Sequence, residues 1–253
     1  MKRIVALVIV ALFTAIAFWF APKGQSAITL SNATAAPIDG QPGMYMVSVT
    51  IHNDGPAAIL AAVTSAEGDM VTVMNPDAPT ATLVVPAGGS GSLAMDGAHI
   101  MLRIDPASFE QGALIPLSLQ FADGTQVTTR VMNTGPSDMQ HGQTNGVAVT
   151  PAPTLSLDLP QGPGTAGFPL ALRVENFTFV QADGDAVHVP NQGHAHVYLN
   201  GLKLGRLYAP TFDVGGLAPG TYRLRVSLNT NDHRPYLKGG VAVSKVVDFA
   251  LPQ

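Results

Sequence analysis

Short runs in which polar and apolar residues alternate follow one another along most of the chain. Residues 46–51 alternate in this way and are followed by the turn sequence Asn53-Asp54-Gly55-Pro56. Alternation with a period of two residues is typical of a β-strand with one buried face, and no convincing helical period follows the first 27 residues. The sequence therefore predicts an all-β fold, with further strands in residues 59–63, 71–74, 82–85, 99–104, 114–121 and 126–131.

A second set of strands is predicted from residue 154 onward. Asn200-Gly201 is a strong hairpin signal between two apolar runs, and residues 222–228 place their apolar side chains on one face. The other face of that strand is expected to carry Thr221, Arg223, Arg225 and Ser227. About seven short strands in this stretch indicate an Ig-like sandwich.

These patterns divide the chain into segments. Lys2 and Arg3 precede an apolar run at residues 4–20, which predicts that residues 1–27 are an export signal. The run is also near the lower length limit of a membrane span, so an uncleaved anchor is the alternative. Two β-sandwich domains are expected to follow, at residues 28–133 and 154–253, with residues 134–153 as a polar linker.

Composition narrows the classes of function. Of 253 residues, 46% are hydrophobic and 12% are charged, and the formal net charge of −4 argues against a nucleic-acid partner. The chain has no cysteine, which excludes disulfides, cysteine zinc sites, blue-copper sites and thiolate copper carriers. A site for a soft metal would therefore have to use the nine methionines and seven histidines.

His99 and Met101 are the first candidate ligands. They stand two residues apart after Gly97, so on a strand their side chains share a face. Imidazole and thioether together favour Cu(I) over zinc and the hard cations. A histidine and a methionine in such a pattern are more often structural than ligating, so the pair alone is a weak signal.

Several short motifs fall in the order found in one known family. They are Ile51-His52-Asn53-Asp54-Gly55, Val71-Thr72-Val73-Met74, Pro86-Ala87-Gly88-Gly89, Gly97-Ala98-His99-Ile100-Met101 and Leu117-Ser118-Leu119-Gln120-Phe121-Ala122-Asp123-Gly124. Over about residues 28–133 the chain resembles the periplasmic copper chaperone family PCu(A)C. The resemblance implies a cupredoxin-like β-sandwich that binds Cu(I) through two histidines and two methionines, and a periplasmic location.

The resemblance is complete in only one half of the ligand motif. His99 and Met101 fall on the family's final His-x-Met pair, whereas Met74 stands where the family has its first histidine. The segment that carries the family's other methionine is shortened here to residues 75–80 and contains no methionine. Met70 or Met95 could complete a set of thioether and imidazole ligands with Met74, His99 and Met101.

The predicted second domain has its own histidine cluster. His194 and His196 share a strand face by their spacing, and His233 follows another strand of the same domain within Asn231-Asp232-His233. Three imidazoles suit Zn(II) or Cu(II) rather than Ca(II) or Mg(II). The alternative is that residues 231–233 form a hydrogen-bonded turn without a metal. The motifs around the cluster also resemble an uncharacterised exported bacterial domain, which implies no function.

The leading hypothesis is a periplasmic copper chaperone, not an enzyme. It would hold Cu(I) through Met74, His99 and Met101 and pass it to a cuproenzyme or a copper-storage partner, while His194, His196 and His233 would bind Cu(II) or Zn(II). One alternative is a three-histidine metalloenzyme, for which Asp232 is the only adjacent candidate base. The other is an exported structural protein in which neither cluster binds metal.

Overall fold

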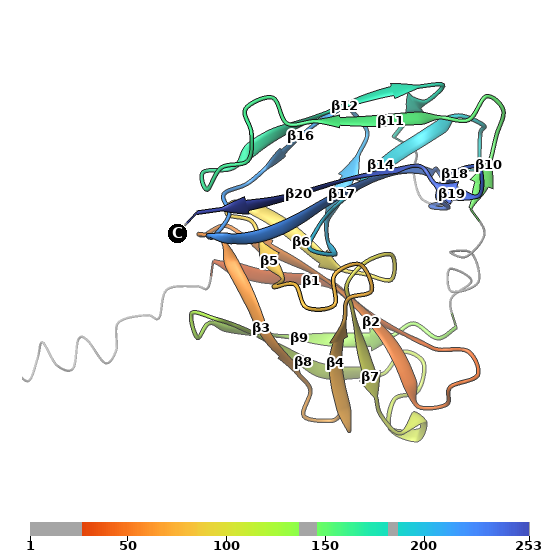
Figure 1. Ribbon diagram of the computed structural model, residues 1–253. Coiled ribbons are helices and arrows are strands. Elements are labelled where there is room, and N and C mark those ends of the chain that lie inside the picture. The colour runs from red at the N-terminus through yellow and green to blue at the C-terminus, as the bar shows by residue number, and fades with distance from the viewer. Residues whose placement is uncertain (1–26, 137–145, 182–186, 253) are drawn as a thin grey trace, which may run out of the picture.

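The computed structural model describes residues 27–136, 146–181 and 187–252, and within these ranges it is built almost entirely of β-strands (Figure 1). The predicted all-β fold is confirmed. The helical element among the described residues is one 3₁₀ turn, η1 (Pro106–Ser108), and no helix in these ranges is long and apolar enough to cross a membrane. Residues 1–26 of the predicted export signal and part of the predicted linker lie outside the described residues.

The strands of the N-terminal half form one continuous, strongly curved sheet. Its order is β7-β2-β1-β9-β8-β3-β5, with β4 added at the outer edge of β7 and β6 pairing with β2 beyond the end of β7. We call these strands the N-terminal half: β1 (Ile28–Pro37), β2 (Met44–Asn53), β3 (Ala58–Thr64), β4 (Met70–Met74), β5 (Val84–Val85), β6 (Gly89–Leu93), β7 (His99–Arg103), β8 (Leu114–Phe121) and β9 (Gln126–Asn133).

The alternating pattern decides which side of each strand faces the core. In β2, Tyr45, Val47, Val49 and Ile51 are buried, and the residues between them face outward. In β7, Ile100 and Leu102 are completely buried. Burial of these apolar side chains is the main stabilising contribution to the sandwich, and it leaves His99, Met101 and Arg103 on the outer face of β7.

The C-terminal half consists of two facing sheets, as expected for a sandwich. One sheet has the order β20-β17-β14-β15 and the other the order β11-β12-β16, and Figure 1 shows the second sheet above the first. This half comprises β11 (Thr154–Asp158), β12 (Phe168–Glu175), β13 (Thr178–Phe179), β14 (Gln192–Leu199), β15 (Leu202–Leu207), β16 (Thr211–Val214), β17 (Gly220–Thr230) and β20 (Ser244–Leu251). A small third sheet of β10 (Val147–Ala148), β18 (Tyr236–Lys238) and β19 (Val241–Ala242) lies beside it.

The predicted hairpin at Asn200-Gly201 joins β14 to β15, and its tip docks on the N-terminal half. Both turn residues have positive φ, 50° and 84°, as a type I′ turn requires. Asn75 donates a hydrogen bond from Nδ2 to the Asn200 carbonyl at 2.8 Å, and the Ala98 amide donates to the Gly201 carbonyl at 2.8 Å. A Cβ atom at Gly201 would lie 2.1 Å from Asn75 Oδ1, so only glycine fits there.

The two halves share one hydrogen-bonded sheet as a result. Lys203 in β15 pairs with Ser92 in β6, which connects the sheet order of one half to that of the other. Strand β15 also contacts β5, and Figure 1 shows β14 and β17 of the C-terminal half above β5 and β6 of the N-terminal half. The boundaries of the predicted domains stay a prediction, but the contact between the halves is built from specific backbone and side-chain bonds.

This contact explains why one residue on the outward face of β17 is buried. Thr221 and Arg223 are exposed on that face as the alternation predicts, whereas Ser227, on the same face, is only 5% exposed. Strand β14, which pairs with β17, is buried on both faces: Ala195 faces the sandwich core, and His196 faces the N-terminal half. The alternation predicted which residues share this face, but the sequence does not show that a second half covers part of it.

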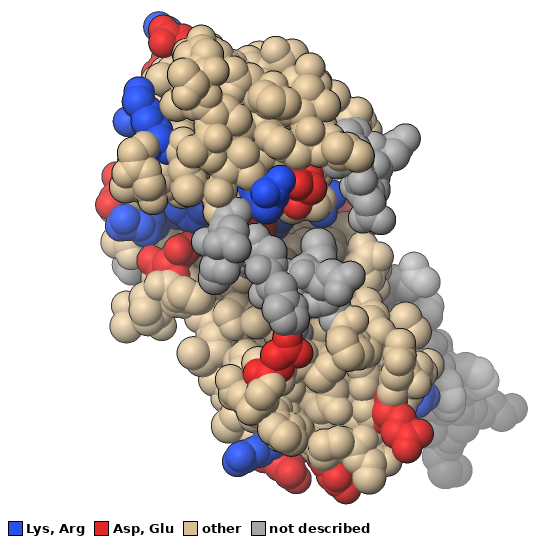
Figure 2. All heavy atoms as spheres, turned by 90° about the vertical axis from the view of Figure 1, so that its right-hand side faces the viewer, with Lys and Arg blue, Asp and Glu red and all other residues tan. Residues whose placement is uncertain are grey.

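Charged side chains are few and scattered on the outside of the molecule. On the face drawn in Figure 2, basic and acidic side chains lie singly or in small mixed groups among uncharged residues, and the described part of that face has no continuous basic patch. This distribution agrees with the low charged fraction of the sequence. It offers no surface suited to a nucleic-acid backbone on this side.

Candidate metal centres

The outer face of β4, β7 and β2 brings the predicted ligands of the N-terminal half together. Met74 in β4 is the direct antiparallel partner of His99 in β7, and Thr72 is the partner of Met101. Directly opposite residues in an antiparallel pair have Cβ atoms about 5 Å apart and side chains on the same face. Met74, His99 and Met101, the three predicted ligands, therefore share one face, with Met74 opposite the imidazole on β4 and Met101 two residues further along β7.

Met46 belongs to the same face, and sequence reasoning missed it. Met46 in β2 is the direct partner of Met101 in β7, so Met101 lies between β2 and β4 with a thioether opposite it. Met44 and Met70 flank Arg103 one row further along. The alternating pattern of β2 contained the signal, since it placed Met46 on the outward side, but only the strand order shows that β2 neighbours β7. We call Met44, Met46, Met70, Met74, His99 and Met101 the methionine face.

Met46 can take the place of the thioether that the shortened segment lacks. Of the two methionines that the sequence suggested for completing the ligand set, Met70 lies on the methionine face. Met95 lies in the connection between β6 and β7 and not on the strands of that face. The shortened segment, residues 75–80, instead contacts the C-terminal half, where Asp77 forms an ion pair with Arg225 at 2.6 Å. A segment that the resemblance would give to metal binding is used here for contact between the halves.

His99 is held in an orientation that suits a ligand. It is 9% exposed, and its Nδ1 lies 3.0 Å from the Gly97 carbonyl oxygen. A carbonyl can only accept, so Nδ1 carries the proton and Nε2 keeps its lone pair for a metal. The thioether opposite it is open to solvent, since Met74 is 48% exposed. The methionine face thus combines a buried imidazole with an accessible sulfur at the sheet edge.

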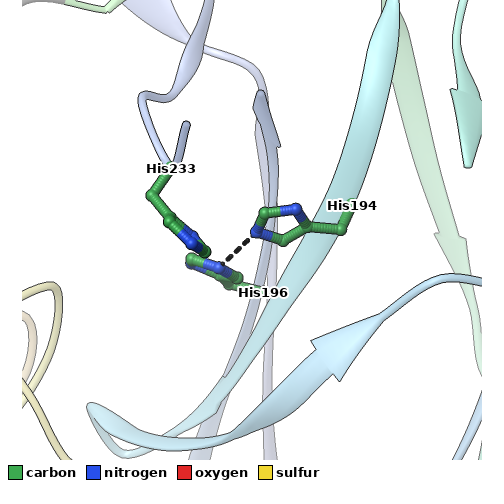
Figure 3. A group of neighbouring side chains, drawn as sticks. All are labelled: His194, His196 and His233. Carbon is green, nitrogen blue, oxygen red and sulfur yellow. Dashed lines mark hydrogen bonds between the residues drawn. The ribbon is translucent and has the colours of Figure 1, made fainter. Parts of the chain in front are cut away.

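The three histidines of the C-terminal half converge as predicted (Figure 3). The ligand nitrogens of His194, His196 and His233 all lie within 4.8 Å of one another, and His194 and His196 are 2% and 1% exposed. The Nε2 atoms of His194 and His196 face each other at 2.8 Å. Three imidazole nitrogens bound to a tetrahedral Zn(II) at about 2.1 Å stand roughly 3.4 Å apart, so small side-chain rotations would give a metal geometry.

His233 reaches the cluster from a tight turn after β17. Its φ is +65°, a left-handed conformation that is rare for residues other than glycine and asparagine. The turn is closed by a hydrogen bond from the His233 amide to the Thr230 carbonyl at 3.0 Å and by the bond between Thr230 and Asp232. The predicted turn is therefore present, and the same turn directs the His233 imidazole toward His194 and His196.

Asp232, the candidate base of the enzyme hypothesis, is engaged elsewhere. Its carboxylate forms an ion pair with Arg234 at 2.6 Å and accepts a hydrogen bond from Thr230. It is not part of the histidine cluster. The structure thus gives no support to Asp232 as a general base at this site.

All three imidazoles are held neutral at ordinary pH. Burial, together with the neighbouring His196, lowers the pKa of His194 to about 2. Burial also lowers the pKa of His196 to about 4, although its hydrogen bond with Asp96 acts in the opposite direction, and burial with the charge of Arg206 lowers that of His233 to about 4. Metal binding requires unprotonated nitrogens, so the cluster needs to lose no proton to bind a metal at pH 7.

These lowered pKa values make the metal-free protein sensitive to acid. Between pH 6.5 and about 4 the unfolded chain protonates His194, His196 and His233 while the folded protein does not, so stability must fall as the pH falls through this window. Urea unfolding with a chelator at pH 7, 6 and 5 should show this loss. His233→Asn, which tolerates the left-handed φ, should reduce the slope, and an unchanged slope would contradict the assignment.

Comparison with known proteins adds a family for the N-terminal half. Residues 28–132 match the family model LpqE-like, described as "Putative lipoprotein LpqE-like". No curated protein matches the chain.

Three solved structures are among those similar to the N-terminal half. The copper-bound PCuAC domain from PmoF2 is 18% identical, and the match covers 44% of this chain and 95% of that chain with a TM-score of 0.38. The apo PCuAC domain from PmoF1 is 22% identical, with 44% of this chain and 96% of that chain covered and a TM-score of 0.38. The solution structure of CuI-DR1885 from Deinococcus radiodurans is 19% identical, with 45% of this chain and 82% of that chain covered and a TM-score of 0.34. Likenesses at these TM-scores support no conclusion by themselves. The LpqE-like family model matches residues 28–132, the stretch in which the sequence resembles PCu(A)C.

Proposed function

We propose that this protein is an exported copper-binding protein that holds Cu(I) on its methionine face and releases it to a partner. The observation that carries the proposal is the strand register that places Met74, His99, Met101 and Met46 on one outer face. Soft thioethers with one imidazole form a donor set that favours Cu(I). The chain has no cysteine that could serve as an alternative soft ligand.

The arrangement of exposure suits exchange of the ion. Met74 and Met70 are 48% and 41% exposed on β4, which pairs among the described strands only with β7 and so lies at a sheet edge. His99 is buried behind them. Cu(I) would pass from this protein to its partner by ligand exchange. The partner's ligands would replace the exposed thioethers first and the imidazole last. The partner would be a cuproenzyme or a copper-storage protein.

The histidine cluster would form a second, harder site. Three neutral imidazoles suit Cu(II) or Zn(II), and thioethers compete poorly for either ion. The two sites would therefore be selective for different ions in one chain. This role is one of binding and delivery and needs no catalytic base.

Metal titration of the full chain tests the proposal. Under anaerobic conditions we expect the protein to take one Cu(I) from a chromophoric chelator, and separately to bind one Zn(II). Loss of His233 should abolish the zinc binding and leave the Cu(I) binding unchanged. A full chain that removes no Cu(I) from the chelator would refute the copper function.

Export is a separate part of the proposal and rests on the basic start and apolar run of residues 1–20. The mature protein would act in the periplasm, free or anchored to the cytoplasmic membrane. A reporter that is active only in the cytoplasm, fused after Gln253, should give no signal. A bright reporter would show that the chain is not exported.

A further inference from the structure

A carboxylate of the N-terminal half lies against the histidine cluster of the C-terminal half. Asp96 belongs to residues 94–98, which connect β6 to β7. Its Oδ2 atom is 2.9 Å from His196 Nδ1, 2.8 Å from the Tyr198 hydroxyl and 2.6 Å from Lys203 Nζ. One carboxylate oxygen from one half thus contacts three side chains of the other.

The contact decides which nitrogen of His196 is available. Asp96 accepts, so the proton of His196 lies on Nδ1, and Nε2 presents its lone pair toward His194. Histidines that bind a metal usually donate their other ring N–H to a carboxylate or carbonyl, which fixes the ring and strengthens the ligand. Asp96 supplies that second interaction for His196 across the contact between the halves.

The position of the carboxylate is set by how the halves dock. The Ala98 amide donates to the Gly201 carbonyl at 2.8 Å, which ties the Asp96 segment to the hairpin tip. A Cβ atom at Gly97 would lie 2.5 Å from that same carbonyl and 3.2 Å from the Tyr198 ring, so glycine is required for the approach. The Tyr198 ring is held in turn by the Arg225 guanidinium, 3.7 Å from its centroid.

We propose that Asp96 is a positioning residue of the three-histidine site, which takes a divalent ion such as Zn(II) or Cu(II) with full affinity only while the two halves are docked. The proposal rests on the second site described above. Because coupling between two equilibria is reciprocal, a metal at the cluster also strengthens the docking. The same connection leads three residues later to His99, so the bound metal stabilises the segment that carries the buried ligand of the methionine face.

Zinc titration of full-length variants tests the role of Asp96. Asp96→Ala should lower the Zn(II) affinity by about 10- to 100-fold, the usual effect of losing the partner of a ligating histidine. Asp248→Asn is the matched control, because it removes a carboxylate that pairs with Arg223 within the C-terminal half and does not touch the cluster. Its affinity should stay within about threefold of wild type, well below that usual loss.

The charge of Lys203 must be separated from the positioning effect. Lys203 Nζ lies 3.3 Å from His196 Nε2, and without Asp96 its charge would be left unbalanced beside the metal. The double variant Asp96→Ala/Lys203→Met removes both charges and should still bind Zn(II) about tenfold or more weakly. Its Co(II) complex should also differ from wild type in its visible spectrum, which reports ligand geometry directly.

The outcomes distinguish this inference from the second site itself. If wild type binds no Zn(II), the second site is absent and the inference falls with it. If wild type binds and Asp96→Ala binds equally well, or the double variant recovers wild-type affinity and spectrum, Asp96 does not position His196. An equal loss in Asp248→Asn would likewise overturn the specific role. Should Asp96→Ala fail to fold, Asp96→Leu/Lys203→Met replaces it, because leucine fills a similar space without an acceptor for His196, and unchanged affinity is again the contrary result.

Discussion

Replacing Met101 by leucine should weaken Cu(I) binding by more than about tenfold, since loss of a ligand costs at least as much as loss of a ligand's partner. Leucine conserves volume, so the free energy of unfolding should change by less than about 1.5 kcal/mol. Met46→Leu should have the same effect, because Met46 is the direct strand partner of Met101. The single variant His99→Ala should lose most of the Cu(I) affinity of the wild type. Competition with a Cu(I) chelator measures each variant.

Met132→Leu is the matched control for these substitutions. Met132 is an exposed methionine in β9, 43% accessible, and lies outside the strands of the methionine face. Its loss should leave Cu(I) affinity unchanged. If Met46→Leu binds Cu(I) as tightly as Met132→Leu while Met101→Leu binds it more weakly, Met46 is not a ligand. If Met101→Leu, Met46→Leu and His99→Ala all bind Cu(I) as tightly as wild type, the side chains of the methionine face serve only strand packing.

Removal of one imidazole from the histidine cluster should abolish Zn(II) binding and its stabilising effect. At a zinc concentration 100 times the Kd, the wild-type protein should gain about 2.7 kcal/mol in unfolding free energy. His233→Asn should gain nothing, while keeping the left-handed φ of +65° that alanine would strain. Urea unfolding with and without zinc measures both.

His99→Ala is the control for the zinc measurement, since it removes a histidine from the other site. It should retain the full zinc-dependent stabilisation. A contrary pattern, in which His233→Asn is strongly destabilised without metal and wild type gains nothing from zinc, would make the cluster a hydrogen-bonded structural network. The 2.8 Å contact between His194 and His196 would then be its central bond.

Zinc binding should also persist to lower pH than an ordinary histidine site would allow. The sequence suggests a loss of affinity near the usual histidine pKa of about 6.5, whereas burial lowers the pKa values of His196 and His233 to about 4. A proton therefore competes with the metal only in more acidic solution. The difference arises from burial of the cluster in the folded protein, which spacing in the sequence does not reveal.

Local patterns were sufficient for the strands and for the residues that share a strand face. Alternation in residues 46–51 and 222–228 predicted β2 and β17, and Asn200-Gly201 predicted the hairpin, because side-chain direction and turn conformation depend on near neighbours. The same rule placed His99 beside Met101 and His194 beside His196. The Gly- and Ser-rich strand β6 was missed, since Gly89–Leu93 carries little apolar signal.

Relations between distant strands were decided only by the tertiary structure. By itself the sequence determined an all-β chain, two groups of strands and the residue types at each candidate site. That Met46 faces Met101, that Asp96 contacts His196, and that the segment 75–80 serves the contact between the halves depend on strand order and docking. Strand order and docking depend on which side chains far apart in the chain are buried together. The local pattern of polar and apolar residues does not show which distant strands pair or in which register.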